Sequence, residues 1–269
     1  MTTDDWARTW IGGSTADAIT VAARDLPSEI MGRLTLTELT YLLVTRRDPT
    51  PGERRMLDAV LVSLADHGLT PSALAARLTY TGAPEAIQGA IAAGLLGAGS
   101  VFLGPTGDTA EFLSDALTAH ADGATGTAAT GAADFDDVTL LEIARTAVDA
   151  CRALHRRVPG LGHPVHKETD PRTPRLYELA AAEGVLGPHL RLLRMVASVH
   201  EARTGRHLPI NGAGAGGAAL VDIGVPPQAI RGVVLIARTA GLVAHLVEEA
   251  GRPLGMPLWL EVEHRASEG

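Results

Sequence analysis

The sequence has one cysteine, and it lacks both long apolar runs and an excess of basic residues. The lone Cys151 excludes an intramolecular disulfide and any metal cluster built on cysteine. Its neighbours at helical spacing are apolar, which favours a core thiol over a reactive one. No stretch approaches the roughly 20 apolar residues of a membrane-spanning helix, and the N-terminus lacks the basic and then apolar pattern of a secretory signal. We therefore expect a cytoplasmic protein with no membrane partner.

The charge balance is acidic, with a formal net charge of −8. A surface that neutralises phosphates needs a basic excess or a basic stripe, so we expect small-molecule partners and no nucleic acid. Lys167 is the single lysine, whereas the other 22 basic residues are arginine. The 269 residues, 46% of them hydrophobic, suffice for one large core or two unequal lobes.

Helical patterns dominate the chain. Thr35 and Thr50 each precede a glutamate by three residues, which is the spacing of a capping box, and Pro51 suits the first helical position. The sequence predicts helices after Thr35, Thr50 and Thr173 and over about 188–204 and 227–250. The one clear strand candidate is Ile19–Ala22. We therefore predict an all-α protein with one small N-terminal β-hairpin.

Residues 119–137 hold a single large apolar side chain, Phe135, among small and acidic residues. Such a segment buries too little surface to offset the entropy lost on ordering. We predict a mobile loop or a linker between lobes, and the alternative is a helix of small residues packed closely on a neighbour.

Two patches carry side chains suited to chemistry: residues 158–172 and residues 237–245. His163 follows Gly160-Leu-Gly162, where glycines allow the backbone to approach a ligand and an imidazole can donate or accept a proton. A loop histidine can equally be a plain hydrogen-bonding residue. Arg238 is a charge inside an apolar helix and needs a partner, either a structural carboxylate or the carboxylate of a ligand.

Residues 158–172 resemble the pattern V-P-G-Y-G-H-x-V-x-R-K-T-D-P-R of the citrate synthase superfamily almost position for position. The segments 65–68 and 237–245 also resemble motifs of this superfamily, whose members make or break the carbon bond between acetyl-CoA and a keto acid. The length is similar to that of the citryl-CoA lyase module of ATP citrate lyase. The resemblance implies a citrate synthase-like helical fold with a larger and a smaller lobe. The resemblance implies that residues 1–118 form the N-terminal part of the large lobe, that 119–137 form a mobile loop or linker, and that 138–220 form the small lobe. Residues 221–269 would return the chain to the large lobe.

The resemblance also implies roles for individual residues. His163 would be catalytic: it would contact the oxygen that is carbonyl in the keto acid and hydroxyl in the product, and it would accept the hydroxyl proton of the substrate. His67, which could otherwise be a histidine favoured by a helix dipole, would be catalytic at the keto-acid end. The backbone of Val158, Gly160, Leu161 and Gly162 would hold coenzyme A, bound as the substrate thioester.

Three further residues are expected to bind substrate: Arg238, Lys167 and Asn211. Arg238 would bind a carboxylate with two parallel hydrogen bonds. Lys167 stands where some members of the superfamily have an arginine that binds a substrate carboxylate, so it would keep the positive charge without the planar geometry of arginine. The alternative is that Lys167 is a plain exposed charge. His245 is expected to pack or hydrogen-bond internally. No metal is expected.

Two departures from the superfamily pattern affect the chemistry. Gly107 stands where the resemblance places a histidine that stabilises the enolised thioester, and Ala213 stands where it places the aspartate that moves a proton on the acetyl group. The lyase module resembles this chain in having glycine at the first position. Asp222 is a candidate replacement for the missing aspartate.

The resemblance therefore predicts a citryl-CoA lyase-like enzyme that cleaves a 3-hydroxyacyl-CoA carrying a carboxylate into a keto acid and an acyl-CoA. A citrate synthase-type transferase ranks behind it. The alternatives are a non-catalytic protein or subunit that binds coenzyme A and carboxylates, and a hydrolase of CoA thioesters. A homodimer or homotetramer is expected, with Arg252 or Arg265 reaching the site of a partner subunit.

Overall fold

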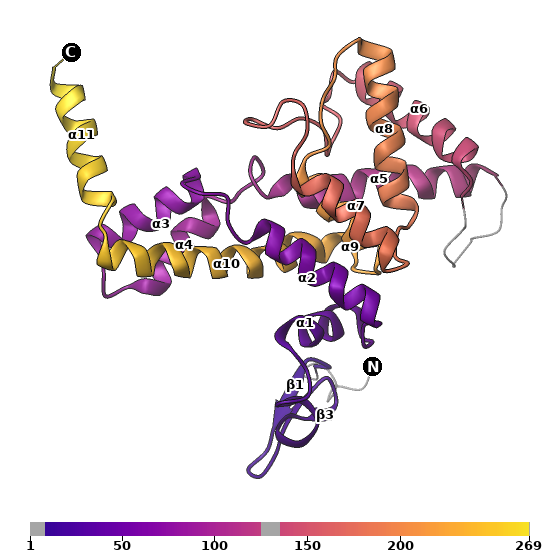
Figure 1. Ribbon diagram of the computed structural model, residues 1–269. Helices are drawn as coiled ribbons and strands as arrows, with labels where there is room; N and C mark the ends of the chain where they lie inside the picture. The colour runs from indigo at the N-terminus through magenta and orange to yellow at the C-terminus, as the bar shows by residue number, and fades with distance from the viewer. Residues whose placement is uncertain (1–8, 125–134, 269) are drawn as a thin grey trace, which may run out of the picture.

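The computed structural model describes residues 9–124 and 135–268, and its helices dominate the fold (Figure 1). A three-stranded antiparallel sheet comes first, with strands β1 (Gly12–Ser14), β2 (Ile19–Val21) and β3 (Arg24–Asp25), followed by a π-helical turn at Leu26–Ile30. The helices are α1 (Leu36–Thr45), α2 (Pro51–Ala65), α3 (Pro71–Gly82), α4 (Ile87–Leu96), α5 (Gly104–Ala124), α6 (Asp137–Ala153), α7 (Arg172–Ala182), α8 (Pro188–Thr204), α9 (Gly212–Asp222), α10 (Pro227–Gly251) and α11 (Gly255–Ser267). The predicted all-α class with a small N-terminal sheet is confirmed.

Local capping signals locate the first helices correctly. Thr35 and Thr50 each accept the backbone N–H of the glutamate three residues on, and that glutamate accepts the backbone N–H of the threonine. Both predicted capping boxes are thus present. The helix predicted after Thr173 is also present as α7, but it begins one residue earlier, at Arg172, and the Thr173 hydroxyl donates to the carbonyl of Ile210 at 2.8 Å.

The predicted strand is the middle strand of the sheet. Thr20 of β2 pairs with Gly13 of β1 on one side and with Asp25 of β3 on the other. The expected hairpin is therefore extended by one further short strand.

The predicted linker begins later than expected. Residues 119–124 form the last turns of α5, since alanine is the strongest helix former and this stretch is rich in it. Helix α6 begins at Asp137, and the Asp136 side chain caps it by accepting the N–H of Thr139 at 2.8 Å. The remaining part, 125–134, lies outside the described residues, so the division of the chain at this point stays a prediction.

Helix α10 connects two packed regions (Figure 1). Its first half joins the main core, formed with residues of α1, α2 and α5 to α9, and its second half packs Leu242 and Leu246 against Ala76 of α3 and Ala90 of α4. By length and composition α10 could also cross a membrane, with a mean hydropathy of 1.6. The core helix of a soluble protein passes the same test, so the absence of a membrane partner stays a prediction.

Glycines allow α9 to pack very closely against its neighbours. A Cβ atom added at Gly214 would lie 2.5 Å from the Cα of Gly160, and one added at Gly217 would lie 2.1 Å from the carbonyl oxygen of Thr106 in α5. Both distances are too short for any side chain. The glycine-rich start of α9 therefore holds the Gly160 loop and the first turn of α5 in place.

Candidate functional site

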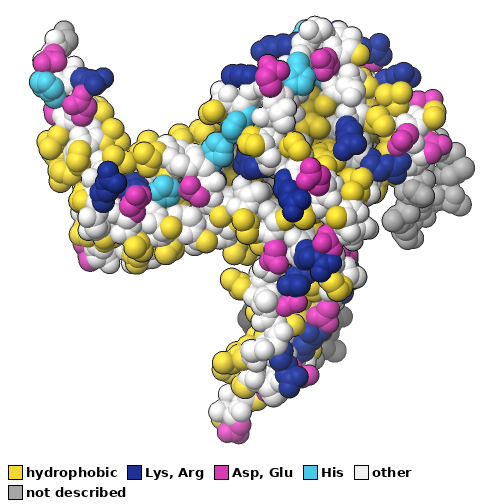
Figure 2. All heavy atoms as spheres, in the orientation of Figure 1, with side chains coloured by type: hydrophobic (Ala, Val, Ile, Leu, Met, Phe, Trp, Pro, Cys, Tyr) yellow, Lys and Arg dark blue, Asp and Glu magenta, His cyan; other side chains and the backbone are white. Residues whose placement is uncertain are grey.

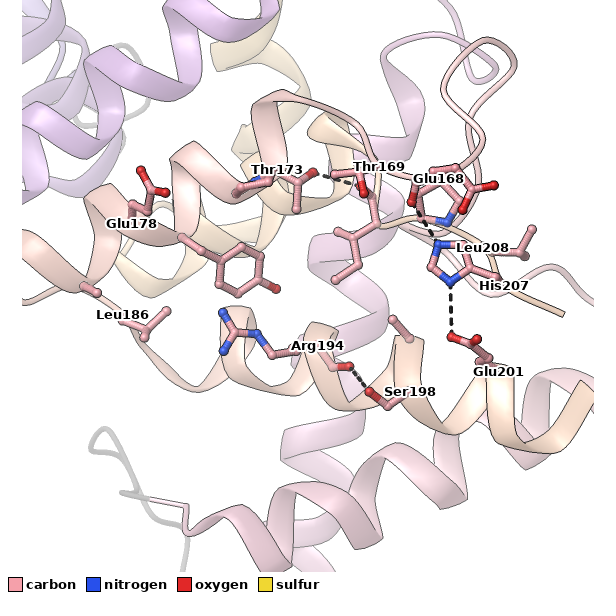
Figure 3. A pocket seen from close by; sticks show the side chains of 16 residues that line it. Glu168, Thr169, Thr173, Glu178, Leu186, Arg194, Ser198, Glu201, His207 and Leu208 are labelled. Atoms are coloured by element: carbon pink, nitrogen blue, oxygen red, sulfur yellow. Dashed lines mark hydrogen bonds and ion pairs between the residues drawn. The ribbon is translucent and has the colours of Figure 1, made fainter. Parts of the chain in front are cut away.

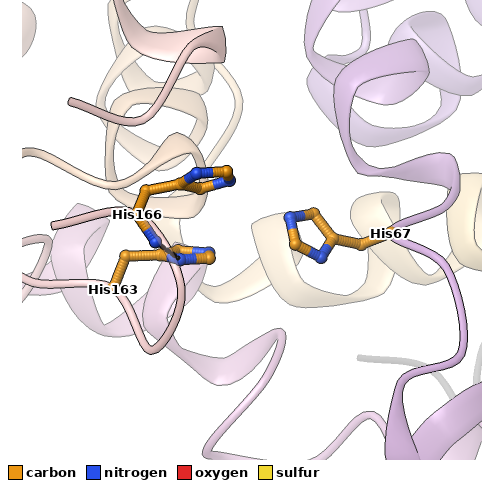
Figure 4. A group of neighbouring side chains, drawn as sticks. All are labelled: His67, His163 and His166. Carbon is orange, nitrogen blue, oxygen red and sulfur yellow. Dashed lines mark hydrogen bonds between the residues drawn. The ribbon is translucent and has the colours of Figure 1, made fainter.

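Three histidines from two distant segments meet in the molecule (Figure 4). His163 and His166 lie on the loop between α6 and α7, and His67 lies between α2 and α3. The His163 and His166 rings stack with centroids 4.5 Å apart, and the His67 ring lies 5.4 Å from His163 and 5.8 Å from His166. The structure thus brings together both histidines that were predicted to be catalytic, and it adds His166, which the sequence reasoning missed.

Backbone amides determine the tautomer of His163. Its Nδ1 accepts the N–H groups of Val165 at 3.1 Å and His166 at 3.0 Å. Because an amide N–H can only donate, Nδ1 carries no proton, and the neutral ring keeps its proton on Nε2. Burial lowers the pKa of His163 more than the negative charge of Asp170 raises it. Near neutral pH, His163 is therefore a hydrogen-bond donor through Nε2.

The same hydrogen bonds argue against a metal ion at this cluster. A ligating histidine offers a lone pair to the metal and normally donates from its other nitrogen, whereas here the Nδ1 lone pair faces two donors and Nε2 holds the proton. The geometry suits an oxygen atom instead. One nitrogen of each ring lies within 4.8 Å of the others, and a point at the centre of such a triangle is about 2.8 Å from each, which is a hydrogen-bond distance.

Asp170 and Arg172 form a two-pronged ion pair near His163. Arg172 donates from Nε to Oδ1 at 2.9 Å and from Nη2 to Oδ2 at 2.7 Å, and the N–H of Gly212 donates to Oδ2 at 2.7 Å. Burial opposes ionisation of Asp170, but these donors hold its pKa far below the usual range. A Cβ atom at Gly212 would lie 2.4 Å from Arg172 Nε, so glycine is needed there. The pair fixes the Arg172 guanidinium next to the histidines.

Arg238 is buried with too few partners. Its side chain is 7% exposed, and its only ion pair with a described residue is a long one, 3.9 Å from Nη1 to Oδ1 of Asp66. Within the described parts of the chain, its Nε has no hydrogen-bond partner. Burial lowers the pKa of Arg238 more than Asp66 raises it, and the positive charge of Arg172 lowers it further. Two guanidinium groups therefore lie near each other, and the carboxylate paired with Arg238 is a distant one.

His245 lies about two helical turns beyond Arg238 on α10. As expected, it hydrogen-bonds within the protein. It contacts Asp66 Oδ1 through Nε2 at 2.8 Å, and its Nδ1 accepts from Arg77 Nε at 3.1 Å.

Asn211 is held by two hydrogen bonds within the protein. Its Oδ1 accepts the N–H of Gly214 at 2.7 Å as the N-cap of α9, and its Nδ2 donates to the carbonyl of Gly162 at 2.9 Å. Asn211 therefore ties the His163 loop to α9. Because a side-chain amide has two N–H donors and one is used here, the substrate contact of Asn211 stays a prediction.

The expected CoA-binding segment is held by backbone hydrogen bonds. Leu161 pairs with Ile210 in an isolated bridge, Gly162 donates to the carbonyl of Pro209 at 2.7 Å, and Asn211 donates to the carbonyl of Gly160 at 3.0 Å. Gly160 and Gly162 have φ values of +82° and +84°, which favour glycine. Val158 is buried in the main core. The segment is rigid and lies directly before His163.

Lys167 lies at the mouth of a small cavity of about 280 Å³ that also contains His163, His166 and Arg206. Its Nζ donates to the carbonyls of His163 at 3.2 Å and Pro164 at 2.8 Å, so in the structure it stabilises the loop. A larger cavity of about 660 Å³ adjoins it between α7 and α8 (Figure 3). The two share Glu168, His207, Leu208 and Pro209.

Gly107 and Ala213 are the two positions at which the resemblance places an acid-base residue that this chain lacks. Gly107 is buried in the first turn of α5, and Ala213 is buried at the second position of α9. Asp222 does not replace the missing aspartate. It is buried and accepts the N–H groups of His189 at 2.9 Å and Leu190 at 3.0 Å, which caps the start of α8.

Sequence reasoning missed Arg172 as well as His166. Arg172 ends the same motif that contains His163, and the signal that could have found it is Asp170, a carboxylate two residues away that needs a cation once buried. His166 follows His163 by three residues in a tight loop, a spacing that returns the chain to the same side.

Comparison with known proteins gives a consistent result. The model of the citrate synthase C-terminal domain matches residues 22–256. The citryl-CoA lyase of Hydrogenobacter thermophilus is 28% identical, with 90% of this chain and 86% of that one covered and a TM-score of 0.76. An ATP citrate lyase of Methanothrix soehngenii, solved with citrate and coenzyme A, is 18% identical, with a TM-score of 0.70. The match covers 90% of this chain and 38% of that one, so this chain spans a little over a third of that protein. Citrate synthase of Pyrobaculum aerophilum is 21% identical, with 82% of this chain and 51% of that one covered and a TM-score of 0.59. No curated protein gives a significant sequence match.

Proposed function

Because this chain belongs to the citrate synthase family, whose C-terminal domain matches residues 22–256, we propose that it is a citryl-CoA lyase. It cleaves a 3-hydroxyacyl-CoA that carries carboxylates into a keto acid and an acyl-CoA. The observation that carries the proposal is the buried and under-partnered Arg238 beside Arg172 and three converging imidazoles. The similarity to the Hydrogenobacter citryl-CoA lyase supports the choice of reaction.

The two arginines bind the carboxylates of the substrate. Arg238 has a free Nε and only a distant carboxylate, so a ligand carboxylate can accept two of its N–H groups. Arg172 is fixed by Asp170 and supplies further positive charge. Burial strengthens both interactions because the surroundings are of low dielectric constant.

The hydroxyl oxygen of the substrate lies among the three imidazoles. His163 donates its Nε2–H to this oxygen, because its Nδ1 already accepts two backbone N–H groups. This role differs from the sequence-based prediction that His163 accepts the hydroxyl proton. The rings of His67 and His166 make no hydrogen bonds to other described residues, so either has a lone pair to accept the hydroxyl proton. As the proton leaves, the hydroxyl carbon becomes a carbonyl, the adjacent carbon bond breaks, and its electron pair moves to the α-carbon of the acyl-CoA.

The resulting enolate takes its proton from water. The second turn of α5 lies beside the CoA-binding loop, since Thr109 packs against Gly160, and the N-terminal end of a helix stabilises negative charge. With Gly107 and Ala213 in place of an acid and a base, turnover is expected to be slow, since each such group commonly contributes about 10²- to 10⁴-fold.

The same two substitutions favour a second candidate, a non-catalytic protein that binds coenzyme A and carboxylates. Calorimetry with coenzyme A and turnover of citryl-CoA separate the two. The lyase binds coenzyme A and releases a keto acid, whereas the binding protein does only the former. Release of free coenzyme A without a keto acid identifies a hydrolase of the thioester.

The protein acts as a homodimer or homotetramer. Exposed apolar side chains follow α11 and one side of α10 (Figure 2): Ile236, Val243, Val247, Met256, Trp259, Leu260 and Val262. Such a surface is typical of a contact between subunits. Arg252 follows α10 and Arg265 lies on α11, and both are exposed, so they are available to a partner. A monomeric mass at micromolar concentration would contradict this.

A further inference from the structure

A continuous line of hydrogen bonds and ion pairs leads from the C-terminal part of α10 to Arg238. Arg77 of α3 is 4% exposed in its side chain and donates from Nη1 to Glu249 at 2.9 Å. The same guanidinium donates from Nε to Nδ1 of His245 at 3.1 Å. His245 in turn reaches Asp66, whose Oδ1 lies 2.8 Å from Nε2. Asp66 pairs with Arg238, and no other carboxylate among residues 9–124 and 135–268 does so.

The direction of each hydrogen bond follows from the donors. Arg77 can only donate, so Nδ1 of His245 is an acceptor and the neutral ring keeps its proton on Nε2. That proton is donated to Asp66. The second oxygen of Asp66 accepts the N–H of Gly68 at 2.8 Å. Burial of Asp66 would raise its pKa, but the donors Gly68 and His245 outweigh burial and lower it. Asp66 is therefore an ionised and oriented carboxylate.

Helix α10 is built to receive this carboxylate. Arg238, Gly241 and His245 follow at spacings of three and four, which places them on one face of the helix. A Cβ atom at Gly241 would lie 2.1 Å from the carbonyl oxygen of Ala65, so only glycine lets the end of α2 come this close. Asp66 follows directly and lies between the side chains of Arg238 and His245.

We propose that Asp66 and His245 are positioning residues that set the orientation of Arg238 for the substrate carboxylate. The proposal rests on the proposed function for the nature of the ligand. The long separation from Asp66 leaves Nε of Arg238 free, so Asp66 restrains the guanidinium without occupying the groups that a carboxylate needs. The other charged groups that face this line are Arg172, near Arg238, and Glu248, which contacts Arg77 and is 56% exposed.

Kinetics on four variants test the proposal. His245→Leu and Asp66→Asn should raise KM for citryl-CoA at least tenfold with kcat within about threefold, because the reacting atoms are untouched. His245→Gln keeps an N–H donor toward Asp66 and should restore KM to within threefold of the unmodified protein. Asp48→Asn is the matched control, since Asp48 is 55% exposed and paired with Arg24, much as Asp66 is 48% exposed. It should leave KM unchanged.

Glycine substitutions probe the backbone contact. Gly241→Ala should raise KM in the same way, and Gly232→Ala on the same helix, where an added Cβ meets nothing within 4 Å, should not. Equal KM values for His245→Leu, His245→Gln and the unmodified protein would overturn the proposal.

A measurement without substrate distinguishes this proposal from the proposed function. Nitrogen relaxation of the Arg238 Nε–H signal reports whether the guanidinium is rigid. We expect a rigid signal in the unmodified protein and in His245→Gln, and a mobile one in His245→Leu. If the unmodified protein neither cleaves citryl-CoA nor binds oxaloacetate, the proposed function is wrong, whereas a signal that stays rigid in His245→Leu overturns the positioning role alone.

Discussion

Replacing Arg238 by methionine should change stability and binding in opposite directions. The side chain of Arg238 is buried at 7% exposure, and its ion pair with Asp66 spans 3.9 Å. Methionine has a similar length and removes a charge whose desolvation is poorly offset. Asp66 keeps its hydrogen bonds to Gly68 and His245 in the variant. Because Asp66 is 48% exposed and keeps these donors, the variant leaves no buried charge without a partner, and its free energy of unfolding should stay unchanged or rise.

The loss in binding should be large, because the ligand carboxylate loses its charged partner. Truncating one side of a buried hydrogen-bonded charge pair costs about 2–5 kcal/mol. Since about 1.4 kcal/mol corresponds to tenfold, the affinity for oxaloacetate should fall about 30-fold to a few thousand-fold. Denaturant unfolding without ligand gives the stability, and calorimetry with oxaloacetate gives the affinity.

Arg77→Met is the matched control for stability. Arg77 is equally buried, with 4% of its side chain exposed, but it contacts Glu248, Glu249 and His245. Its removal leaves Glu249, 2% exposed, without its cation and should cost about 3–5 kcal/mol. If Arg238→Met lost as much stability as Arg77→Met and still bound oxaloacetate normally, Arg238 would be a structural residue and the carboxylate site would be wrongly placed.

His163→Ala should abolish cleavage of citryl-CoA while coenzyme A affinity stays within a few fold, because the cofactor contacts the backbone before His163; retained cleavage would make His163 structural. The pH dependence should follow His163, whose pKa is lowered by burial: kcat should rise with a midpoint below the usual value of about 6.5 and be flat above it. The lowered pKa of His163 also reduces stability at low pH, because the unfolded chain takes up the proton more readily; the free energy of unfolding should therefore fall as the pH drops below about 6.5. A midpoint of kcat above pH 7 would contradict the assignment. Ala213→Asp should raise deuterium uptake at the α-carbon of acetyl-CoA at least tenfold, and a folded variant without gain would show that the pocket has been rebuilt.

Local patterns made much of the fold predictable. The capping boxes at Thr35 and Thr50 depend on residues three apart, so the first helices could be placed from the sequence. The last turns of α5 were missed because small residues that bury little can still continue a helix once it has begun.

The site was predictable only where a motif carried it. His163 and His67 were expected, but the tautomer of His163 depends on a loop geometry that brings two amides onto Nδ1. Arg172 and Asn211 show the same limit. The Arg172 side chain packs against Gly212, and Asn211 donates to the carbonyl of Gly162, each some 40 to 50 residues away in the chain, so their roles follow from tertiary contacts.

Cleavage of citryl-CoA by the purified protein tests the proposed reaction most directly. The assay follows oxaloacetate through its reduction by malate dehydrogenase and follows the thioester separately. We predict one oxaloacetate and one acetyl-CoA for each citryl-CoA consumed, with the rate lost in His163→Ala. Formation of citrate and free coenzyme A, or binding of coenzyme A with no product at all, would contradict the proposed lyase.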